Sequence, residues 1–376
     1  MQKLSTGYYT MKTKDKPFHI AIAGGGTGGH LFPGIAVAEA VKEMNPKNQI
    51  LFLGTDRPLE LKILSQTPYN HTIIPAGGLK NLTLKTKIQS LLQIPLGILK
   101  AIRMYHEFNP HIVLGVGGYV SAPCVLAANL MGIPVVIQEQ NSIPGLANRM
   151  LAKTADRIYV SFPQTITWFR ANKTVYTGNP VRKSIVETSR KQTRQTHKKF
   201  TVFIVGGSQG SSPINKSLVD ALAHLDDQQI SFIHQSGSDD EAMLTHAYKQ
   251  KNIQADVRAF FHDMMTPYEQ SDLIICRAGA TTVAELSILG KPAIIIPFPH
   301  AADDHQVKNA QAVVDAGGAE MIVENQLSGY LLADRIRFFA NNPGALETMH
   351  HKSLAFARPF AAQQIARDCY QLSTIS

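Results

Sequence analysis

The stretch Gly24-Gly25-Gly26-Thr27-Gly28-Gly29-His30 indicates how this chain folds. Before it lies the apolar run His19-Ile20-Ala21-Ile22-Ala23, which is typical of a buried strand, and from Pro33 onward apolar residues recur at helical spacing. A strand, a glycine-rich turn and a helix start together form a phosphate site, because missing Cβ atoms let a ligand approach and free N–H groups attract anions. The pattern therefore predicts an α/β unit with an anion site.

His30 stands where this helix is expected to begin, and it is the first candidate for chemistry. The competing interpretation is that its ring only caps or packs the helix. Gly24, Gly26 and Gly29 also fit GxGxxG, a weak signal by itself, so an NAD(P)-dependent oxidoreductase is one alternative. That alternative needs an acidic residue at the end of the second strand, and Asp56 comes too late to match well.

Bulk properties narrow the class of protein. The chain has 376 residues, which favours two domains, and 44% of them are hydrophobic, which is ordinary for a globular protein. Residues 1–16 are polar and are expected to form a disordered extension. Three widely spaced cysteines fit a reducing, cytoplasmic setting. The net charge of +9 allows a nucleic acid, an anionic membrane or a phosphorylated substrate as partner.

The opening pattern repeats in the second half of the chain. The apolar run at 200–205 leads into a second glycine-rich turn at 206–211. We therefore expect two doubly wound parallel α/β domains, at 17–180 and 181–352, with a ligand cleft between them. The last segment, about 353–372, is expected to be helical and to pack back on the first domain.

Strand and helix signals alternate along both halves, which favours parallel sheets with ligands at the carboxyl ends of the strands. The expected strands lie at 19–23, 49–53, 72–75, 111–114, 134–137, 157–160, 200–205, 230–234, 257–261, 273–276 and 293–297.

The stretch 277–285 carries candidate ligand-binding residues. Arg277 follows a strand directly and offers a fork of donors suited to a diphosphate, and Gly279 opens a helix. Glu285 lies two turns further and could bind both hydroxyls of a ribose. The competing interpretation for Glu285 is an ordinary surface residue of a helix.

A polar helix start at 303–310 suits recognition of a sugar. Asp303, Asp304 and His305 resemble part of a metal site, but no matching second cluster and no Asp-x-Asp pair accompany them. No metal is therefore expected.

Residues 79–103 combine apolar and basic side chains, which suits an anionic membrane surface. Pro95 and Gly97 are expected to interrupt this region. The competing interpretation is a core-facing helix with a solvated basic face. The candidates for membrane contact are Lys80, Lys85, Lys87, Leu91 and Leu92.

Taken together, these motifs resemble the UDP-N-acetylglucosamine:undecaprenyl-diphospho-muramoylpentapeptide N-acetylglucosaminyltransferase family. The resemblance extends from about 19 to 367. It rests on an ordered set of motifs at 24–30, 115–121, 139–141, 178–182, 206–210 and 277–285, followed by His305-Gln306. It implies a GT-B fold, two Rossmann-like domains facing across a cleft, with the donor in the second domain, the acceptor in the first and no cofactor.

The resemblance also implies residue roles. Glu285 resembles the ribose ligand, Phe261 a backbone contact to uracil, and Asn141 a residue near the acceptor. Members commonly carry histidine before Glu-Gln-Asn, whereas this chain has Gln138, which cannot take a proton usefully at neutral pH. His30 is the predicted general base, because an imidazole with a pKa near neutral can accept the hydroxyl proton. The implied substrate-binding positions are Thr27, Gly28, Gly29, Asn141, Arg182, Ser208, Gln209, Phe261, Arg277, Glu285, His305 and Gln306.

The implied reaction is direct displacement with inversion, in which the muramic acid O4 hydroxyl attacks UDP-GlcNAc and a β1→4 link forms. The resemblance implies a peripheral enzyme on the cytoplasmic face of the inner membrane. Its expected partners are UDP-GlcNAc, an undecaprenyl-diphosphate-linked muramoyl-pentapeptide and an anionic membrane, with cell-wall synthesis proteins as candidates and no nucleic acid. A non-enzymatic basic membrane or nucleic-acid adaptor is the last alternative. It requires exposed aromatics among the basic residues, which Trp168 and dispersed lysines do not supply.

Overall fold

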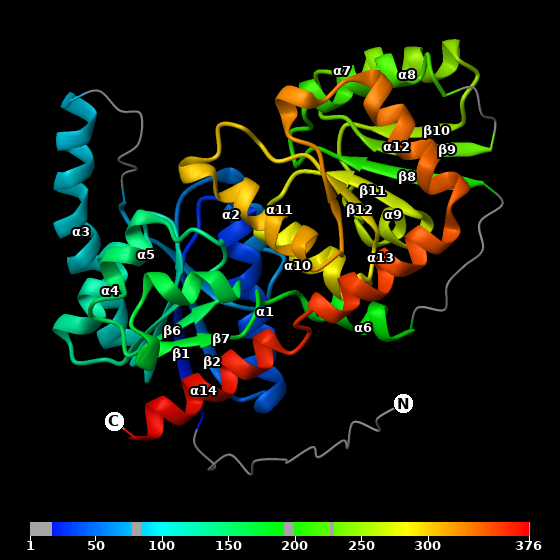
Figure 1. The fold of residues 1–376 in the computed structure, drawn as a ribbon. Helices are drawn as coiled ribbons and strands as arrows, with labels where there is room; N and C mark the ends of the chain where they lie inside the picture. Colours follow the sequence, from blue (N-terminus) through cyan, green and yellow to red (C-terminus); the bar gives the residue numbers. More distant parts are fainter. Residues whose placement is uncertain (1–16, 77–83, 192–198, 226–228, 376) are drawn as a thin grey trace, which may run out of the picture.

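The structure, a computed structural model, describes residues 17–76, 84–191, 199–225 and 229–375. The expected extension at 1–16 lies outside the described residues. Two parallel sheets, each covered by helices on both faces, form the two halves of the molecule (Figure 1). The expected α/β class, with two doubly wound domains, is confirmed.

The first sheet has seven parallel strands in the order β3-β2-β1-β4-β5-β6-β7. Its central strands are apolar on both faces, as expected of a sheet that helices cover on both sides. Their bounds are β1 (His19–Gly24), β2 (Gln49–Gly54), β3 (Asn70–Ile73), β4 (Ile112–Gly117), β5 (Val135–Glu139), β6 (Arg157–Val160) and β7 (Thr174–Tyr176).

Alternate residues of β1 enter different cores. Ile20 and Ile22 belong to one buried cluster, and Ala21 and Ala23 belong to the other. The first cluster includes residues of α1 (Gly28–Met44), α2 (Pro58–Leu64) and α14 (Ala361–Ile375). The second includes residues of α3 (Leu84–Phe108), α4 (Ser121–Leu130) and α5 (Leu146–Leu151).

The second sheet has six parallel strands in the order β10-β9-β8-β11-β12-β13. Helices α6, α9, α10 and α11 cover one face, and α7, α8, α12 and α13 cover the other. The strands are β8 (Phe200–Val205), β9 (Ile230–Gln235), β10 (Ala255–Arg258), β11 (Leu273–Cys276), β12 (Ala293–Ile295) and β13 (Glu320–Met321). The helices are α6 (Lys183–Lys191), α7 (Ser212–Ala221), α8 (Glu241–Gln250), α9 (Met265–Gln270), α10 (Ala280–Leu289), α11 (His305–Asp315), α12 (Gly329–Asn341) and α13 (Pro343–Phe356).

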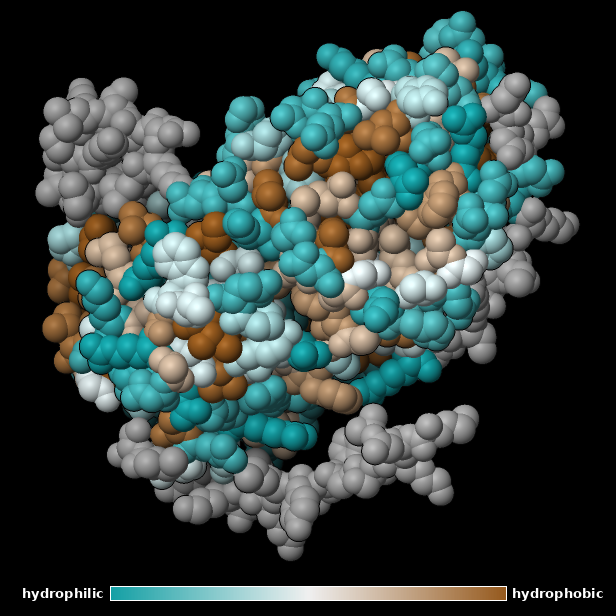
Figure 2. All heavy atoms as spheres, in the orientation of Figure 1, coloured by the Kyte–Doolittle hydropathy of each residue, from teal (hydrophilic) through white to brown (hydrophobic). Residues whose placement is uncertain are grey.

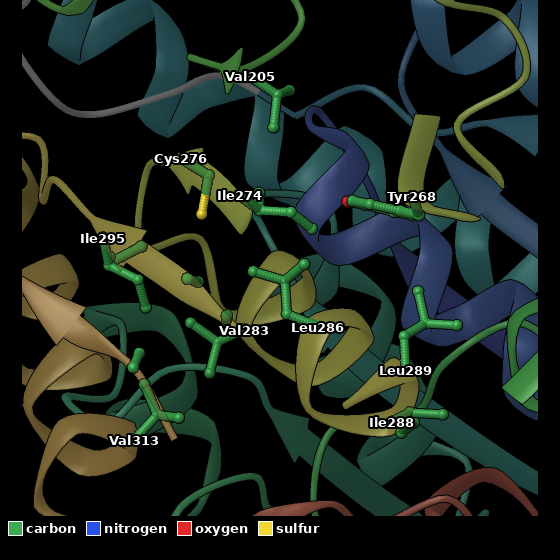
Figure 3. Close-up of a cluster of buried hydrophobic side chains, with 14 of the residues drawn as sticks. Val205, Tyr268, Ile274, Cys276, Val283, Leu286, Ile288, Leu289, Ile295 and Val313 are labelled. Carbon is green, nitrogen blue, oxygen red and sulfur yellow. The ribbon is translucent and has the colours of Figure 1, made fainter. Parts of the chain in front are cut away.

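Helix α10 is anchored by its apolar face. Val283 and Leu286 point toward Ile274 and Cys276 of β11, with Ile295 of β12 beside them (Figure 3). This packing fixes the start of α10 directly after the end of β11.

The winding of each sheet reverses at one point. In the first sheet the reversal lies between β1 and β4, and in the second between β8 and β11. The glycine-rich stretch at 24–29 begins at the last residue of β1, and that at 115–118 forms the end of β4, which extends three residues beyond the expected strand; the stretches at 206–210 and 277–279 follow the second pair. Ligands of doubly wound folds bind at such reversal points. The motifs singled out in the sequence therefore occupy the two places where ligands are expected.

Several elements differ from the sequence-based expectation. Helix α1 begins at Gly28, not at Pro33, because Pro33 is tolerated in the second turn with its ring filling the core. Helix α3 runs through Pro95 and Gly97 without interruption. Gly97 allows this helix to pack closely, since a Cβ there would lie 2.5 Å from the carbonyl oxygen of Pro75.

The expected single helix over 353–372 is instead the end of α13 and most of α14, separated at Pro359, which cannot continue a helix from the preceding turn. Strands β3 and β10 begin two residues earlier than expected. Strands β7 and β13 are not apparent in the sequence, because they are only three and two residues long.

Helix α14 completes the core of the first sheet, although it follows the whole second sheet in the chain. It packs mainly against α1, and it also contacts β4 and, through Asp368, β6. Its buried residues in this core are Ala362, Ile365, Ala366 and Cys369. Among the helices of the described residues, none combines the length and the apolar character needed to cross a membrane.

Replacing Ile365 by Ala is expected to destabilise the first domain, because the side chain is fully buried. Deleting a buried Ile side chain to Ala costs about 2–5 kcal/mol. The measurement is urea unfolding followed by the fluorescence of Trp168, the only tryptophan, which lies in this half of the chain. The exposed neighbour Gln364→Ala is the control, and an equal midpoint for the two variants would contradict the role given to α14.

Candidate active site

His30 lies in the first turn of α1, at the reversal point of the first sheet. Its Nδ1 lies 3.0 Å from Oε1 of Gln140, which follows β5. Burial lowers the pKa of His30, with a smaller opposing effect of its hydrogen bonds, and the charge of His305 across the domain boundary lowers it further. The ring is therefore held neutral in the pH range where a general base works.

The two glycine-rich turns of the first domain touch each other beside His30. A Cβ on Gly118, whose φ is +80°, would lie 2.5 Å from the carbonyl oxygen of Gly25. A Cβ on Gly117 would lie 2.8 Å from Nδ1 of His30. Glycine at these two positions is thus required for His30 to sit against the end of β4.

A buried carboxylate already holds the first turn. Glu60 accepts hydrogen bonds from the backbone N–H of Gly26 at 2.7 Å and from the backbone N–H of Thr55 at 2.8 Å. Arg57 donates to the carbonyl oxygen of Gly26 at 2.7 Å. The N–H of Gly26 is therefore occupied, and an anion at this turn would have to use the N–H groups of the helix start. Nothing local in the sequence marks Glu60 for this role.

The second reversal point holds a cavity of about 480 Å³. Residues 205–207 and 210–213 line one side, and Arg277, Gly279, Thr282, Phe298 and Gln306 line the rest. A cavity of this size can take a drug-sized or nucleotide-like ligand.

Arg277 is more constrained than its predicted role suggests. Its guanidinium donates to Ser211 Oγ at 2.6 Å and to the carbonyl oxygens of Ile296 and Pro297, and it pairs with Glu324 at 2.5 Å. Its terminal nitrogens therefore clamp three segments around the cavity. A bound diphosphate would have to share or replace these partners.

The side-chain amide of Gln306 is held in place by two hydrogen bonds to its oxygen. Its Oε1 accepts from the backbone N–H groups of Ala278 at 3.1 Å and Phe298 at 3.0 Å. This leaves its Nε2 as a donor at the cavity. The neighbouring His305 begins α11, and its Nδ1 bonds the carbonyl oxygen of Ala302 at 2.8 Å.

Glu285 is buried and paired with protein groups. Its Oε1 lies 3.4 Å from Nη2 of Arg182, and its Oε2 accepts from the hydroxyl of Tyr268 at 3.4 Å. Burial raises the pKa of Glu285, and the charge of Arg182 opposes that rise. Arg182 also lies over the ring of Phe32 on α1, 4.4 Å from its centroid. The pair therefore bridges the two domains, and Glu285 does not belong to the lining of the large cavity.

The other predicted donor residues occupy different environments. Phe261 is buried, and its backbone N–H donates to Oε1 of Gln235 at 2.9 Å, so only its carbonyl remains for a nucleobase. Ser208 and Gln209 are exposed in the turn before α7, and Thr27 is exposed before α1. Gly28 and Gly29 form the first turn of α1.

A buried amide joins the two domains. Asn309 on α11 is fully buried, and its Oδ1 accepts from the backbone N–H of Ser142 at 2.8 Å. Its Nδ2 donates to Oδ1 of Asn141 and to the carbonyl oxygen of Ala278, both at 3.1 Å. Asn141 is thereby held at the domain boundary. The sequence drew attention to the helix start that contains Asn309 but gave no sign of this contact.

The predicted membrane contacts cannot be placed in detail. Lys80 lies outside the described residues. Lys85, Lys87, Leu91 and Leu92 are on α3, but their side chains are outside what the structure describes. In the part of the chain that the structure covers, no group of His, Cys, Asp and Glu is arranged to hold a metal ion.

Two Rossmann-like domains with a nucleotide-sized cavity at one reversal point and a histidine at the other have the architecture of the GT-B class, to which many glycosyltransferases belong. Matches to protein-family models agree with this class. The model of the glycosyltransferase family 28 N-terminal domain matches residues 20–160, and that of the C-terminal domain matches residues 201–365.

Curated relatives identify the family more closely. A protein of Myxococcus xanthus (strain DK1622) is 40% identical over 94% of this chain and 92% of its own length. One of Syntrophus aciditrophicus (strain SB) is 41% identical over 93% and 97%. The crystal structure of Acinetobacter baumannii MurG is 30% identical, with a TM-score of 0.76 over 94% of this chain and 100% of that one. The Myxococcus and Syntrophus proteins are both named UDP-N-acetylglucosamine–N-acetylmuramyl-(pentapeptide) pyrophosphoryl-undecaprenol N-acetylglucosamine transferase. This chain belongs to their family.

Replacing Asn309 by Asp is expected to loosen the domain boundary. The change keeps the side-chain shape but places a carboxylate oxygen against the carbonyl oxygen of Ala278 and Oδ1 of Asn141. Leaving buried polar groups without a donor costs about 1–3 kcal/mol. Amide hydrogen exchange at 139–145 and 277–281 should therefore become faster. Asn129→Asp, at a surface hydrogen bond to Thr154, is the matched control. Unchanged exchange would show that Asn309 does not hold the domains together.

Proposed function

We propose that this chain transfers N-acetylglucosamine from UDP-GlcNAc to the muramic acid O4 hydroxyl of an undecaprenyl-diphosphate-linked muramoyl-pentapeptide. The observation that carries the proposal is the contact between the two reversal points: the carbonyl oxygen of Gly29, next to His30, lies 3.5 Å from Thr281 Oγ1 of α10, and the adjacent Thr282 lines the large cavity. A proton acceptor from one domain thus lies beside the donor-sized cavity of the other. The oxidoreductase and adaptor alternatives find no support among the relatives.

In this proposal the donor occupies the second domain. The starts of α7 and α10 direct backbone N–H groups toward the cavity, which suits a diphosphate. Gln306 offers its Nε2 to the sugar, and Arg277 and Arg182 supply positive charge. Glu285 binds the ribose hydroxyls once it exchanges its bond to Arg182 for them, which would release Arg182 toward the diphosphate.

The reaction is an in-line displacement at the anomeric carbon. The O4 hydroxyl attacks from the side opposite the diphosphate, its proton passes to Nε2 of His30, and UDP leaves with the bonding electron pair. Inversion of the α-linked donor gives the β1→4 link. Helix starts and guanidinium groups stabilise the charge that develops on the leaving diphosphate.

The face formed by α3, α4 and α5 supports binding at a membrane surface. These helices pack side by side, and Figure 2 shows hydrophobic residues at the edge of the molecule where Figure 1 places α4. The exposed apolar residues on this face are Leu96, Leu99, Leu126, Leu130, Leu146 and Met150, and Leu130 is 73% exposed. Exposed Lys100 and Lys153 flank them. We infer peripheral binding to anionic lipid at the cytoplasmic face of the inner membrane, where a polyprenyl-anchored acceptor would be met.

Calorimetry measures binding of UDP-GlcNAc, and turnover assays measure the proton transfer to His30, so the two roles can be tested separately. Glu285→Gln should weaken UDP-GlcNAc binding about 10-fold or more, because charge-assisted hydrogen bonds contribute about 1.5–3 kcal/mol. His30→Asn should leave donor binding unchanged and lower turnover about 10²–10⁴-fold, the usual contribution of a general base. The proposal fails if His30→Asn turns over normally, or if the protein does not bind UDP-GlcNAc.

Charge-reversal variants should show whether vesicle binding depends on lysines of the α3–α5 face or only on the net charge of the protein. The double variant Lys100→Glu/Lys153→Glu is expected to bind anionic vesicles at least about 10-fold less tightly, since each lysine near the surface contributes about 1 kcal/mol. Lys249→Glu/Lys251→Glu, an equal charge change at exposed lysines in the second domain, should bind as the parent does. Equal loss in both double variants would contradict a specific membrane face.

A further inference from the structure

The side-chain amide of Gln140 determines which ring nitrogen of His30 carries the hydrogen. Gln140 is buried, and its Nε2 donates to the carbonyl oxygen of Val116 at 2.6 Å. A carbonyl oxygen can only accept, so this end of the amide must be the nitrogen, and Oε1 faces His30 at 3.0 Å. Because Oε1 can only accept, Nδ1 of His30 must carry the hydrogen. Its Nε2 then keeps the lone pair that accepts a proton.

A one-residue bulge brings the Val116 carbonyl to this place. Along the β1–β4 pair, Ala23 is opposite Gly115 but Gly24 is opposite Gly117, so Val116 is left out of the register. Bulges near sites change the direction of local groups. The acceptor that orients Gln140 therefore comes from an irregularity at the end of β4.

Gln138 determines the orientation of Gln140 from the other side. Its Oε1 is in close contact with Nε2 of Gln140. Its own Nε2 donates to Ser161 Oγ and to Asn179 Oδ1, both at 3.1 Å. The Ser161 hydroxyl donates to the carbonyl oxygen of Glu139 at 2.8 Å, so toward Gln138 it accepts. With two acceptors at its nitrogen, Gln138 must present its oxygen to Gln140.

The hydrogen bonds continue across the domain boundary in the same direction. Asn179 Nδ2 lies 3.4 Å from Thr281 Oγ1, and Thr281 Oγ1 lies 3.5 Å from the carbonyl oxygen of Gly29. Inside α1 that carbonyl would normally bond the N–H of residue 33, but Pro33 has none. The series thus runs from the His30 ring to the residue that precedes His30, and hydrogen bonds aligned in this way strengthen one another.

We propose that Gln140 and Gln138 are positioning residues that hold His30 as the Nδ1–H tautomer, with Nε2 free to take the acceptor proton. Neither glutamine touches the substrates in this proposal. Reversing Gln140 would place its oxygen against two acceptors, the Val116 carbonyl and Gln138 Oε1. The inference rests on the role of His30 in the proposed function, but the tautomer can be observed without any reaction.

Glutamine at position 138 has a specific consequence. An amide has one fixed donor end and one fixed acceptor end at every pH, whereas histidine, common in the family motif at this position, changes its donors with protonation and tautomer. Gln138 is fully buried, so water does not compete for its partners. A histidine here could still accept from Gln140 with one ring nitrogen and donate to Asn179 with the other.

The test is the tautomer of His30, read from the nitrogen shifts of the ¹⁵N-labelled imidazole in the ligand-free protein, with His30→Asn to identify the signal. The parent is expected to show hydrogen on Nδ1 only. Gln140→Leu and Gln138→Leu should both give a mixture of tautomers. Gln138→His should keep the single Nδ1–H form of the parent. Ser161→Ala removes one acceptor of Gln138 but leaves Asn179, so it should keep the single form and serves as the matched control.

The pH dependence of turnover gives a second readout that a purely structural role would not change. The titratable group found to act on His30 across the boundary is His305 on α11, which every variant retains. Loss of the Gln140 acceptor destabilises the protonated ring, so in Gln140→Leu the acid limb of kcat/KM should move to lower pH while the plateau falls about 10-fold, a part of the usual contribution of a general base. A single Nδ1–H form in Gln140→Leu with an unmoved limb would overturn the inference. Normal turnover in His30→Asn would overturn only the role of His30.

Discussion

Each parallel sheet has to reverse its winding once, and the rest of this molecule depends on where the two reversals lie. Strand ends diverge at a reversal, so side chains and backbone N–H groups there have no neighbouring crossover helix to cover them. In this chain the two reversal points meet at one boundary. Gly29 of the first lies against Thr281 of the second, and Asn141 lies against Asn309. The chemistry is therefore built from two separate sheets.

The boundary is held by directional groups as well as by apolar packing, such as that of Phe162 against the core of the second sheet. Asn309 uses both ends of its amide, Arg182 contacts a ring of one domain and a carboxylate of the other, and Lys183 at the start of α6 pairs with Glu43 of α1. Such contacts have a narrow range of acceptable geometry. They therefore restrict the relative placement of the domains more narrowly than the apolar contacts alone would.

Much of this arrangement could be predicted from the sequence, because strands that end in glycine-rich turns are a strong local signal. The turn at 24–30 and the stretch at 277–285 were predicted to lie at the carboxyl ends of strands, and both lie at reversal points. The contacts within the site could not be predicted in the same way. His30 and Gln140 are 110 residues apart, and their alignment depends on a bulge that leaves Val116 out of register. The role of Glu60 at the first turn has no local signal, because its partner there, Gly26, lies 34 residues earlier in the chain.

The return of α14 to the first domain has a consequence for synthesis of the chain on the ribosome. Phe18, the first buried residue of the part of the chain that the structure describes, packs edge-on against Tyr370, with ring centroids 5.5 Å apart. The core that contains Phe18 and β1 is therefore incomplete until α14 has emerged. After β7 about 200 further residues must be added, which takes roughly 10–40 s at ordinary elongation rates. During that interval the inner face of α1 is exposed, and the second domain, which is complete without α14, is free to fold first.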